Sequence, residues 1–170
     1  MFRKTSFLLI LLLSIGAGVF SQGTDLEEKK PIVLNGIEYG YFIKNEQTKT
    51  AKGEEYGRFE ITLYANNKSG CTRLFAQRFS LTSTDDANIL ATFNCSNANG
   101  KRLTAKTGNV RARDFYVNAK VTENGKETNQ SVKAGYIFRN GETLKANIIV
   151  LVPLGERPLL NCSINTLPDL

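Results

Sequence analysis

The apolar residues of this chain recur at every second position in seven separate segments, and this alternation limits the chain to an all-β fold. Successive side chains of a strand point to opposite faces, so a period of two indicates a strand with one buried face. No segment after residue 21 has the 3.6-residue period of an amphipathic helix. The alternating segments are residues 37–43, 59–65, 89–95, 115–121, 132–138, 144–152 and 160–164.

Turn signals separate these segments. Asn-Gly pairs occur at residues 35–36, 99–100, 124–125 and 140–141, and Asn-Gly suits the type I′ turns of β-hairpins because both residues tolerate a positive φ. The polar segments 44–57 and 80–88 predict long loops. The pattern predicts a single antiparallel β-sandwich of the immunoglobulin-like type with about 7–9 strands. We place this domain at residues 31–165, between a mobile N-terminal tail at 22–30 and a C-terminal tail at 166–170.

The first 21 residues have the parts of a secretory signal peptide. Arg3 and Lys4 form a basic start, an apolar run follows from residue 7 to residue 19, and Ser21 offers a small residue for cleavage. The alternative is a membrane anchor, but the run is shorter than the roughly 18–20 apolar residues of a spanning helix. No cysteine near Ser21 offers a lipid attachment point. We therefore expect a secreted or periplasmic protein, with no transmembrane segment in the mature chain.

The chain contains no histidine, which excludes Ser-His-Asp and Cys-His catalysis and any zinc site that uses imidazole. We expect no catalytic, cofactor-binding or metal-ligating residues, and therefore a protein that is not an enzyme. The remaining catalytic alternative is a hydrolase with two carboxylates, although nothing in the sequence brings two of them together. Its candidate residues are Glu54, Glu55, Glu60, Asp85, Asp86 and Asp114.

Three cysteines leave at least one thiol unpaired. In an oxidising compartment we expect a disulfide between Cys71 and Cys95, because a hairpin centred near residue 84 would bring them to the same level. The second candidate pair is Cys95 with Cys162, since the alternation of their segments turns both side chains toward the core. The third thiol is then either buried and inert or available for a link to another chain.

Two surfaces are candidates for ligand binding. The first is a basic segment that would suit an anionic ligand, formed by Lys101, Arg102, Lys106, Arg111 and Arg113. A solvated strand edge accounts for the same charges. We favour this explanation because the formal net charge of +6 falls to +4 once Arg3 and Lys4 are removed with the signal peptide, and +4 is an ordinary value for a domain of this size. For the same reason we expect no nucleic-acid partner. The second surface is the predicted loop 44–57, in which Tyr56 is the candidate contact residue.

Two segments and the end of the signal sequence resemble those of small exported β-sandwich proteins of Bacteroidetes-type bacteria, which are uncharacterised. The segments are Asn-Gly-Lys-Arg-Leu-Thr-Ala-Lys-Thr-Gly at 99–108 and Val-Pro-Leu-Gly-Glu-Arg-Pro at 152–158, together with Phe-Ser-Gln at 20–22. The resemblance covers about the last two-thirds of the chain. It implies a periplasmic or extracellular location and no particular activity.

These observations lead to one functional hypothesis and two alternatives. We expect an exported, non-catalytic binding or interaction module whose partner is an envelope or extracellular protein or a glycan, bound without a cofactor. The first alternative is a structural envelope or matrix component that associates with itself. The second alternative is the carboxylate hydrolase. The sequence leaves the ligand and the oligomeric state open.

Overall fold

The computed structural model describes residues 23–76, 87–97, 102–123 and 125–170. These residues form an all-β structure of antiparallel strands without a helix. Eleven strands are therefore described, more than the 7–9 predicted. They are β1 (Thr24–Leu26), β2 (Ile32–Leu34), β3 (Ile37–Ala51), β4 (Glu54–Asn67), β5 (Arg73–Ala76), β6 (Ile89–Ser96), β7 (Arg102–Arg111), β8 (Arg113–Glu123), β9 (Lys126–Phe138), β10 (Thr143–Pro153) and β11 (Leu159–Ile164).

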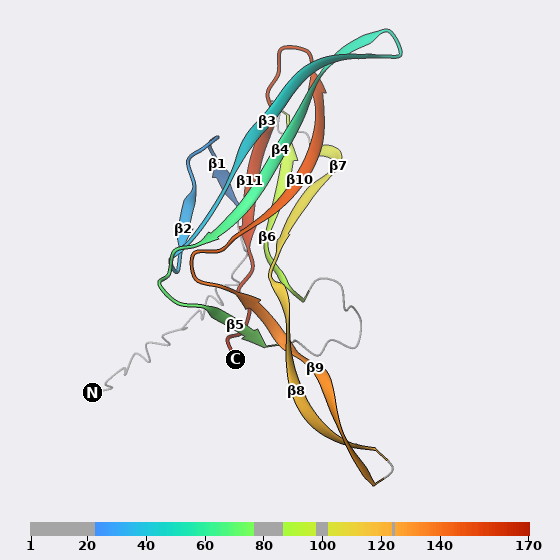
Figure 1. Cartoon of the computed structure of the whole chain (residues 1–170). Helices are drawn as coiled ribbons and strands as arrows, with labels where there is room; N and C mark the ends of the chain where they lie inside the picture. Colours follow the sequence, from blue (N-terminus) through green and yellow to red (C-terminus); the bar gives the residue numbers. More distant parts are fainter. Residues whose placement is uncertain (1–22, 77–86, 98–101, 124) are drawn as a thin grey trace, which may run out of the picture.

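The strands form three sheets, which we name by their inner strands. The β6 sheet has the order β1-β11-β6-β7, the β4 sheet has the order β10-β4-β3-β2, and the β9 sheet has the order β5-β9-β8. The first two sheets face each other as two layers, with β7 against β10 and β6 and β7 against β4. The third sheet extends away from these two layers (Figure 1). A single sandwich was predicted, so the third sheet is an addition to that architecture.

The hydrophobic core lies between the two layers. Its largest fully buried side chains include Phe59 and Leu63 from β4 and Phe93 from β6, all at most 1% exposed. These residues lie on apolar faces that the alternation predicted. Five of the predicted segments turn their apolar side chains inward: 37–43, 59–65, 89–95, 144–152 and 160–164. The period of two therefore located the core wherever a second layer covers the strand.

The predicted loop at residues 44–57 is wrong. β3 runs to Ala51 and β4 begins at Glu54, so a tight turn at Lys52-Gly53 joins two long strands. Both turn residues have positive φ, 53° and 80°, which is the conformation that a two-residue hairpin turn requires. The segment is polar because this end of the hairpin is largely exposed, and polarity alone gave no sign of its strand conformation.

Both predicted tails pair with strands. β1 pairs with β11 and buries Leu26. The C-terminal residues follow β5: the Ala76 amide donates to the carbonyl of Pro168 at 2.8 Å, and the Leu170 amide donates to the carbonyl of Leu74 at 3.0 Å. Because these pairs satisfy backbone groups at sheet edges, both segments belong to the folded unit.

Candidate functional site

The hairpin of β8 and β9 is exposed along most of its length. β7 ends at Arg111, and after the buried Ala112 the chain continues as β8, which leaves the β6 sheet and pairs with β9. β5 borders β9 only from Gly135 to Phe138. Beyond that point the hairpin projects from the molecule (Figure 1), and we call residues 117–132 the arm. Among the described strands, none borders the arm on either edge.

The arm carries an apolar stripe that no other described strand covers. Val117 and Val132 are directly paired and are 39% and 40% exposed. Ala119 and Val121 follow on the same face of β8, where both are only partly buried. The prediction that segments 115–121 and 132–138 bury their apolar faces along their whole length is therefore wrong for the arm. The reason is that burial needs an opposing layer, and the described residues provide none over the arm.

Charged and aromatic contacts hold the base of the hairpin. Lys133 on β9 lies 2.7 Å from the carboxylate of Asp114 on β8 and 4.5 Å from the centre of the Tyr136 ring. The hydrogen bond to Asp114 raises the pKa of Lys133, so the ammonium stays charged. Arg113 forms a second ion pair at 2.7 Å with Glu142, in the turn before β10. The base is thus fixed to the core, whereas the arm is not.

The predicted basic surface is divided between two sheets. Lys101 and the side chains of Arg102 and Lys106 lie outside the described residues. Arg111 ends β7 and donates to the side-chain oxygen of Asn88 at 2.9 Å, while Arg113 begins β8 and is paired with Glu142. Because the sheet changes at Ala112, the two arginines do not share one strand face, and both bind groups of this chain.

Tyr56 lies on β4 rather than in a loop, near the tip of the β3–β4 hairpin. Its hydroxyl donates to the carboxylate of Glu54, two residues earlier on the same strand. This hydrogen bond raises the pKa of Tyr56. Tyr56 is half-buried, and it also faces Pro153 across the pairing with β10. The structure therefore gives Tyr56 a local partner at the end of the hairpin.

The described candidate carboxylates are Glu54, Glu55 and Glu60 on β4 and Asp114 on β8. Glu60 on β4 accepts a hydrogen bond from Arg58 at 2.6 Å, which lowers its pKa, and a general acid needs the opposite shift. Asp114 is paired with Lys133 on β9, and Glu54 and Glu55 lie at the exposed tip of the other hairpin. Asp85 and Asp86 lie outside the described residues. In the part of the chain that is described, no cluster of three potential metal ligands occurs.

The disulfide predicted between Cys71 and Cys95 is not seen. The hairpin on which it rested does not form, because β5 pairs with β9 and β6 pairs with β7 and β11. The buried side chain of Asn67 donates to the carbonyls of Cys71 and Phe138, both at 3.0 Å, and so directs the chain toward β9. Cys71 is exposed at this turn.

The second candidate pair, Cys95 and Cys162, lies on neighbouring strands. Cys95 is opposite Leu160 and Cys162 is opposite Phe93, so the two thiols are diagonal neighbours on the buried face. Diagonal positions are about 7–8 Å apart, which is beyond the usual range for a disulfide. Burial raises the pKa of the Cys162 thiol to about 12. This thiol is therefore protonated and shielded at neutral pH.

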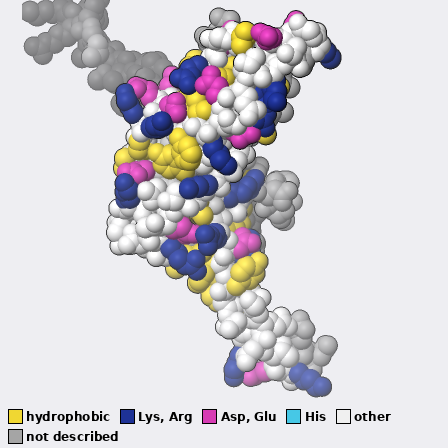
Figure 2. Space-filling model, turned by 45° about the horizontal axis from the view of Figure 1, so that its top comes forward, with side chains coloured by type: hydrophobic (Ala, Val, Ile, Leu, Met, Phe, Trp, Pro, Cys, Tyr) yellow, Lys and Arg dark blue, Asp and Glu magenta, His cyan; other side chains and the backbone are white. Residues whose placement is uncertain are grey.

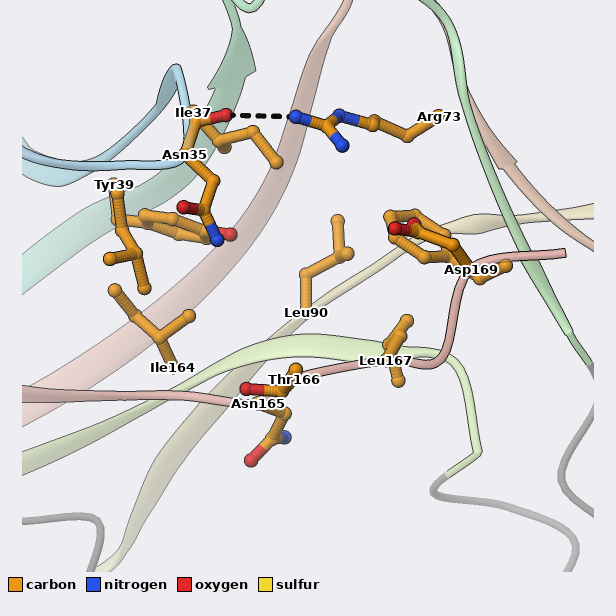
Figure 3. Close-up of a pocket in the computed structure, with 12 residues that line it drawn as sticks. Asn35, Ile37, Tyr39, Arg73, Leu90, Ile164, Asn165, Thr166, Leu167 and Asp169 are labelled. Atoms are coloured by element: carbon orange, nitrogen blue, oxygen red, sulfur yellow. Dashed lines mark hydrogen bonds between the residues drawn. The ribbon is translucent and has the colours of Figure 1, made fainter.

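A small cavity lies between β5, the turn before β3 and the C-terminal segment (Figure 3). Arg73 reaches across it and donates to the carbonyl of Asn35 at 3.3 Å, while its Nε is buried with no hydrogen-bond partner in the described part of the chain. Leu90, Ile164 and Leu167 form an apolar wall. The volume of about 100 Å³ is below the roughly 150 Å³ of a cavity that holds benzene. The cavity therefore suits water rather than a large ligand.

The arm is the feature that analysis of the sequence missed, although a signal for it was present. The segment that pairs with β8 reads Lys-Glu-Thr-Asn-Gln-Ser from residue 126 to residue 131 and is polar on both faces. A strand within two layers needs one apolar face, so this composition indicated a ribbon outside the core. The alternating apolar residues of β8 concealed that signal.

Comparison with protein-family models, curated proteins and solved structures gave no match to this chain. In the described part of the chain, no helix has the length and apolar character needed to cross a bilayer. The functional argument therefore rests on the geometry of the molecule.

Proposed function

We propose that the protein is an exported, non-catalytic interaction module that binds a partner polypeptide along its arm. The free strand edges of the arm carry this proposal. Unpaired backbone N–H and C=O groups along an edge are a template for an added strand, and natural proteins usually cover or block them. The two facing four-stranded sheets then serve as a rigid base. Their immunoglobulin-like character is part of the same proposal.

The chemistry of the arm supports a protein partner. An added strand gains backbone hydrogen bonds from the edge, and the stripe of Val117, Ala119 and Val121 offers apolar contacts to alternate side chains of that strand. The charges of the arm balance, since it contains two lysines and two glutamates, and Lys120 and Glu127 form an ion pair at 3.5 Å while both remain exposed. The arm therefore has little means of attracting a strongly charged ligand.

Export is the first part of the proposal to test. Protein purified from the envelope and from the medium of its native host should begin at Gln22, as determined by N-terminal sequencing and intact mass. Its retention in the cytoplasm with Met1 or Phe2 at its start would contradict export. This measurement is independent of the partner.

Site-specific photo-crosslinking in the native host tests the arm itself. A photoreactive phenylalanine at Asn118 should yield a covalent complex with a protein, whereas the same group at Ile149 should not. Ile149 is a matched control because it is 45% exposed on a strand of the two-layer body. A crosslink at Ile149 that equals or exceeds the one at Asn118 would contradict binding through the arm.

Two neighbouring proline variants show whether the strand edge carries the binding. Successive N–H groups on β8 point alternately toward β9 and toward the free edge. Of Asn118→Pro and Ala119→Pro, one therefore breaks a hydrogen bond within the hairpin and the other removes only a free donor. For this comparison the photoreactive group is moved to Thr122, an exposed residue on the same face of β8 as Asn118. The variant that retains the native amide spectrum of β9 should still lose the crosslink. Retention of the crosslink by both variants would argue against strand addition.

A further inference from the structure

A second surface lies on the outer face of the β4 sheet, away from the arm. Tyr64 on β4 is opposite Gly40 on β3, and its ring extends over that glycine. A Cβ atom at position 40 would lie 2.6 Å from the Tyr64 hydroxyl oxygen, so only glycine leaves room for the ring. The Tyr64 ring is thereby laid across the sheet, with its outer face half-exposed.

Phe42 extends this aromatic floor. Its ring centre lies 6.4 Å from that of Tyr64, and the two ring planes are inclined at 40°. Together they line an open groove of about 390 Å³, within the range of about 300–1,000 Å³ that is typical of small-molecule sites. Hydrophobic side chains form a patch on this side of the molecule, with acidic and basic side chains at its margin (Figure 2).

The margin of the groove consists of polar groups that the sheet holds in register. Glu38, Asn66 and Thr143 form one row across the three strands, and Lys145 is opposite Tyr64 in the next row. Glu38 is fixed by hydrogen bonds from Lys68 at 2.7 Å and from Asn66 at 3.2 Å. In the described part of the chain, the Tyr64 hydroxyl and the Lys145 ammonium have no hydrogen-bond partner.

We propose that this groove binds a sugar ring of a glycan. A pyranose has a face of C–H groups and a margin of hydroxyls, and the groove has the complementary arrangement: two aromatic faces in its floor and donors and acceptors at its margin. Tyr64 and Lys145 supply free donors, and Glu38 and Asn66 supply acceptors. This site is separate from the arm, so it does not depend on the proposed function.

The position of Tyr64 over Gly40 has a second explanation, because an aromatic ring over a glycine stabilises a sheet. That role accounts for Tyr64 but not for the rest of the groove. Phe42 has no glycine beneath it, since it is opposite Thr62, and the polar margin adds nothing to such stacking. An experiment must therefore separate ligand binding from stability.

The test is a titration of the mature chain followed by amide chemical shifts, with cellobiose, chitobiose and digalacturonate as separate probes. Binding with a Kd in the millimolar range should move the amides of residues 38–42, 62–66 and 143–147. Phe42→Ala and Tyr64→Ala should each weaken it by about tenfold or more, and Lys145→Ala by less. Cyclohexanol, an apolar ring without a hydroxyl margin, should not reproduce these shifts.

Tyr116→Ala is the matched control, because Tyr116 is an exposed aromatic residue outside the groove; binding in this variant should equal that of the natural protein. If Tyr64→Ala does not fold, Phe42→Ala decides the question, because it leaves the contact between Tyr64 and Gly40 in place. The proposal is overturned if none of the three sugars moves these amides, if cyclohexanol moves them equally, or if a folded Phe42→Ala variant binds as before.

Discussion

The β3–β4 hairpin and the β8–β9 hairpin are both long and antiparallel, and each contains alternating apolar residues, but only the first has its apolar face buried against a second sheet. β10 pairs with β4 from Tyr56 to Asn66, and the β6 sheet covers the inner face. β8 and β9 have only the four-residue β5 beside their base. Alternation within a hairpin thus gives it an apolar face, whereas its neighbours decide whether that face is buried.

The two hairpins consequently have different energetic roles. Phe59, Ile61, Leu63 and Ala65 on β4 are at most 1% exposed, so each contributes its full burial to the free energy of folding. Val117 and Val132 on the arm retain about two-fifths of their surface in water. A two-stranded hairpin without a covering layer is marginal by itself. The arm therefore adds little to stability, which agrees with a surface that serves a partner.

The sharpest test of this contrast is a pair of truncations, Phe59→Ala on β4 and Val117→Ala on β8. Phe59→Ala should reduce the free energy of unfolding by about 3–5 kcal/mol, because it leaves a cavity in a closed core. Val117→Ala should change it by no more than about 0.5 kcal/mol. Urea denaturation of both variants measures the difference. Equal losses would mean that the arm belongs to the cooperative core.

The same contrast explains how much of the fold could be predicted from the sequence. The segments 37–43, 59–65 and 144–152 were assigned to the core from their alternation alone. That assignment holds because a facing sheet covers them in the structure. Strand order is a different matter, because it depends on contacts between distant residues. Asn67 illustrates this: its amide bonds to Phe138, 71 positions later, and no local pattern indicates that partner.

The candidate sites could be predicted even less well. Phe42, Tyr64 and Lys145 come together only through the register of β3, β4 and β10, which the sequence does not show. The basic residues were visible as a cluster, but the change of sheet at Ala112 separates Arg111 from Arg113. A cluster along the chain becomes a surface only if the backbone keeps it on one face.

Gly135 lies where the pairing of β5 with β9 ends, between the supported base of the β8–β9 hairpin and its free part. Its substitution should have the next largest effect on the free energy of unfolding. Its φ is +156°, and a Cβ atom there would lie 2.2 Å from the carbonyl oxygen of Phe75 on β5. Gly135→Ala should therefore cost about 2–3 kcal/mol, because the backbone of β5 or β9 must move. Gly125→Ala is the control: its φ is also positive but nothing lies near it, so its cost should be about 1 kcal/mol. Thermal unfolding distinguishes the two.

Alkaline pH should lower the free energy of unfolding through titratable groups buried in the core, which lie outside the arm. Burial raises the pKa of Cys162 from 9.0 and that of Tyr39 from 10.0 to about 12 in the folded state. The unfolded chain therefore loses these protons first as the pH rises, and stability falls above about pH 9. Each group should contribute a loss of about 1.4 kcal/mol per pH unit between its two pKa values.

Urea midpoints measured from pH 8 to pH 11 test this expectation, with Cys162→Ala as the matched variant. In that variant the decline should begin near pH 10 instead, where Tyr39 acts together with the other tyrosines whose pKa is raised, Tyr41, Tyr56 and Tyr64. A stability that is flat across this range in the natural protein would contradict the burial of both groups.

Removing most of the arm should have only a small effect on stability. Deleting residues 119–122 together with 127–130 keeps the register and the alternation of the remaining pairs, and it should change the free energy of unfolding by less than about 1 kcal/mol. The matched deletion of residues 48–51 and 54–57 removes the end of the β3–β4 hairpin, to which β10 is paired, and it should cost about 2 kcal/mol or more. If the arm deletion costs as much as the tip deletion, the contrast between the hairpins fails. If it costs little but abolishes crosslinking, the arm serves binding, because the body that remains is intact and only the free edges are gone.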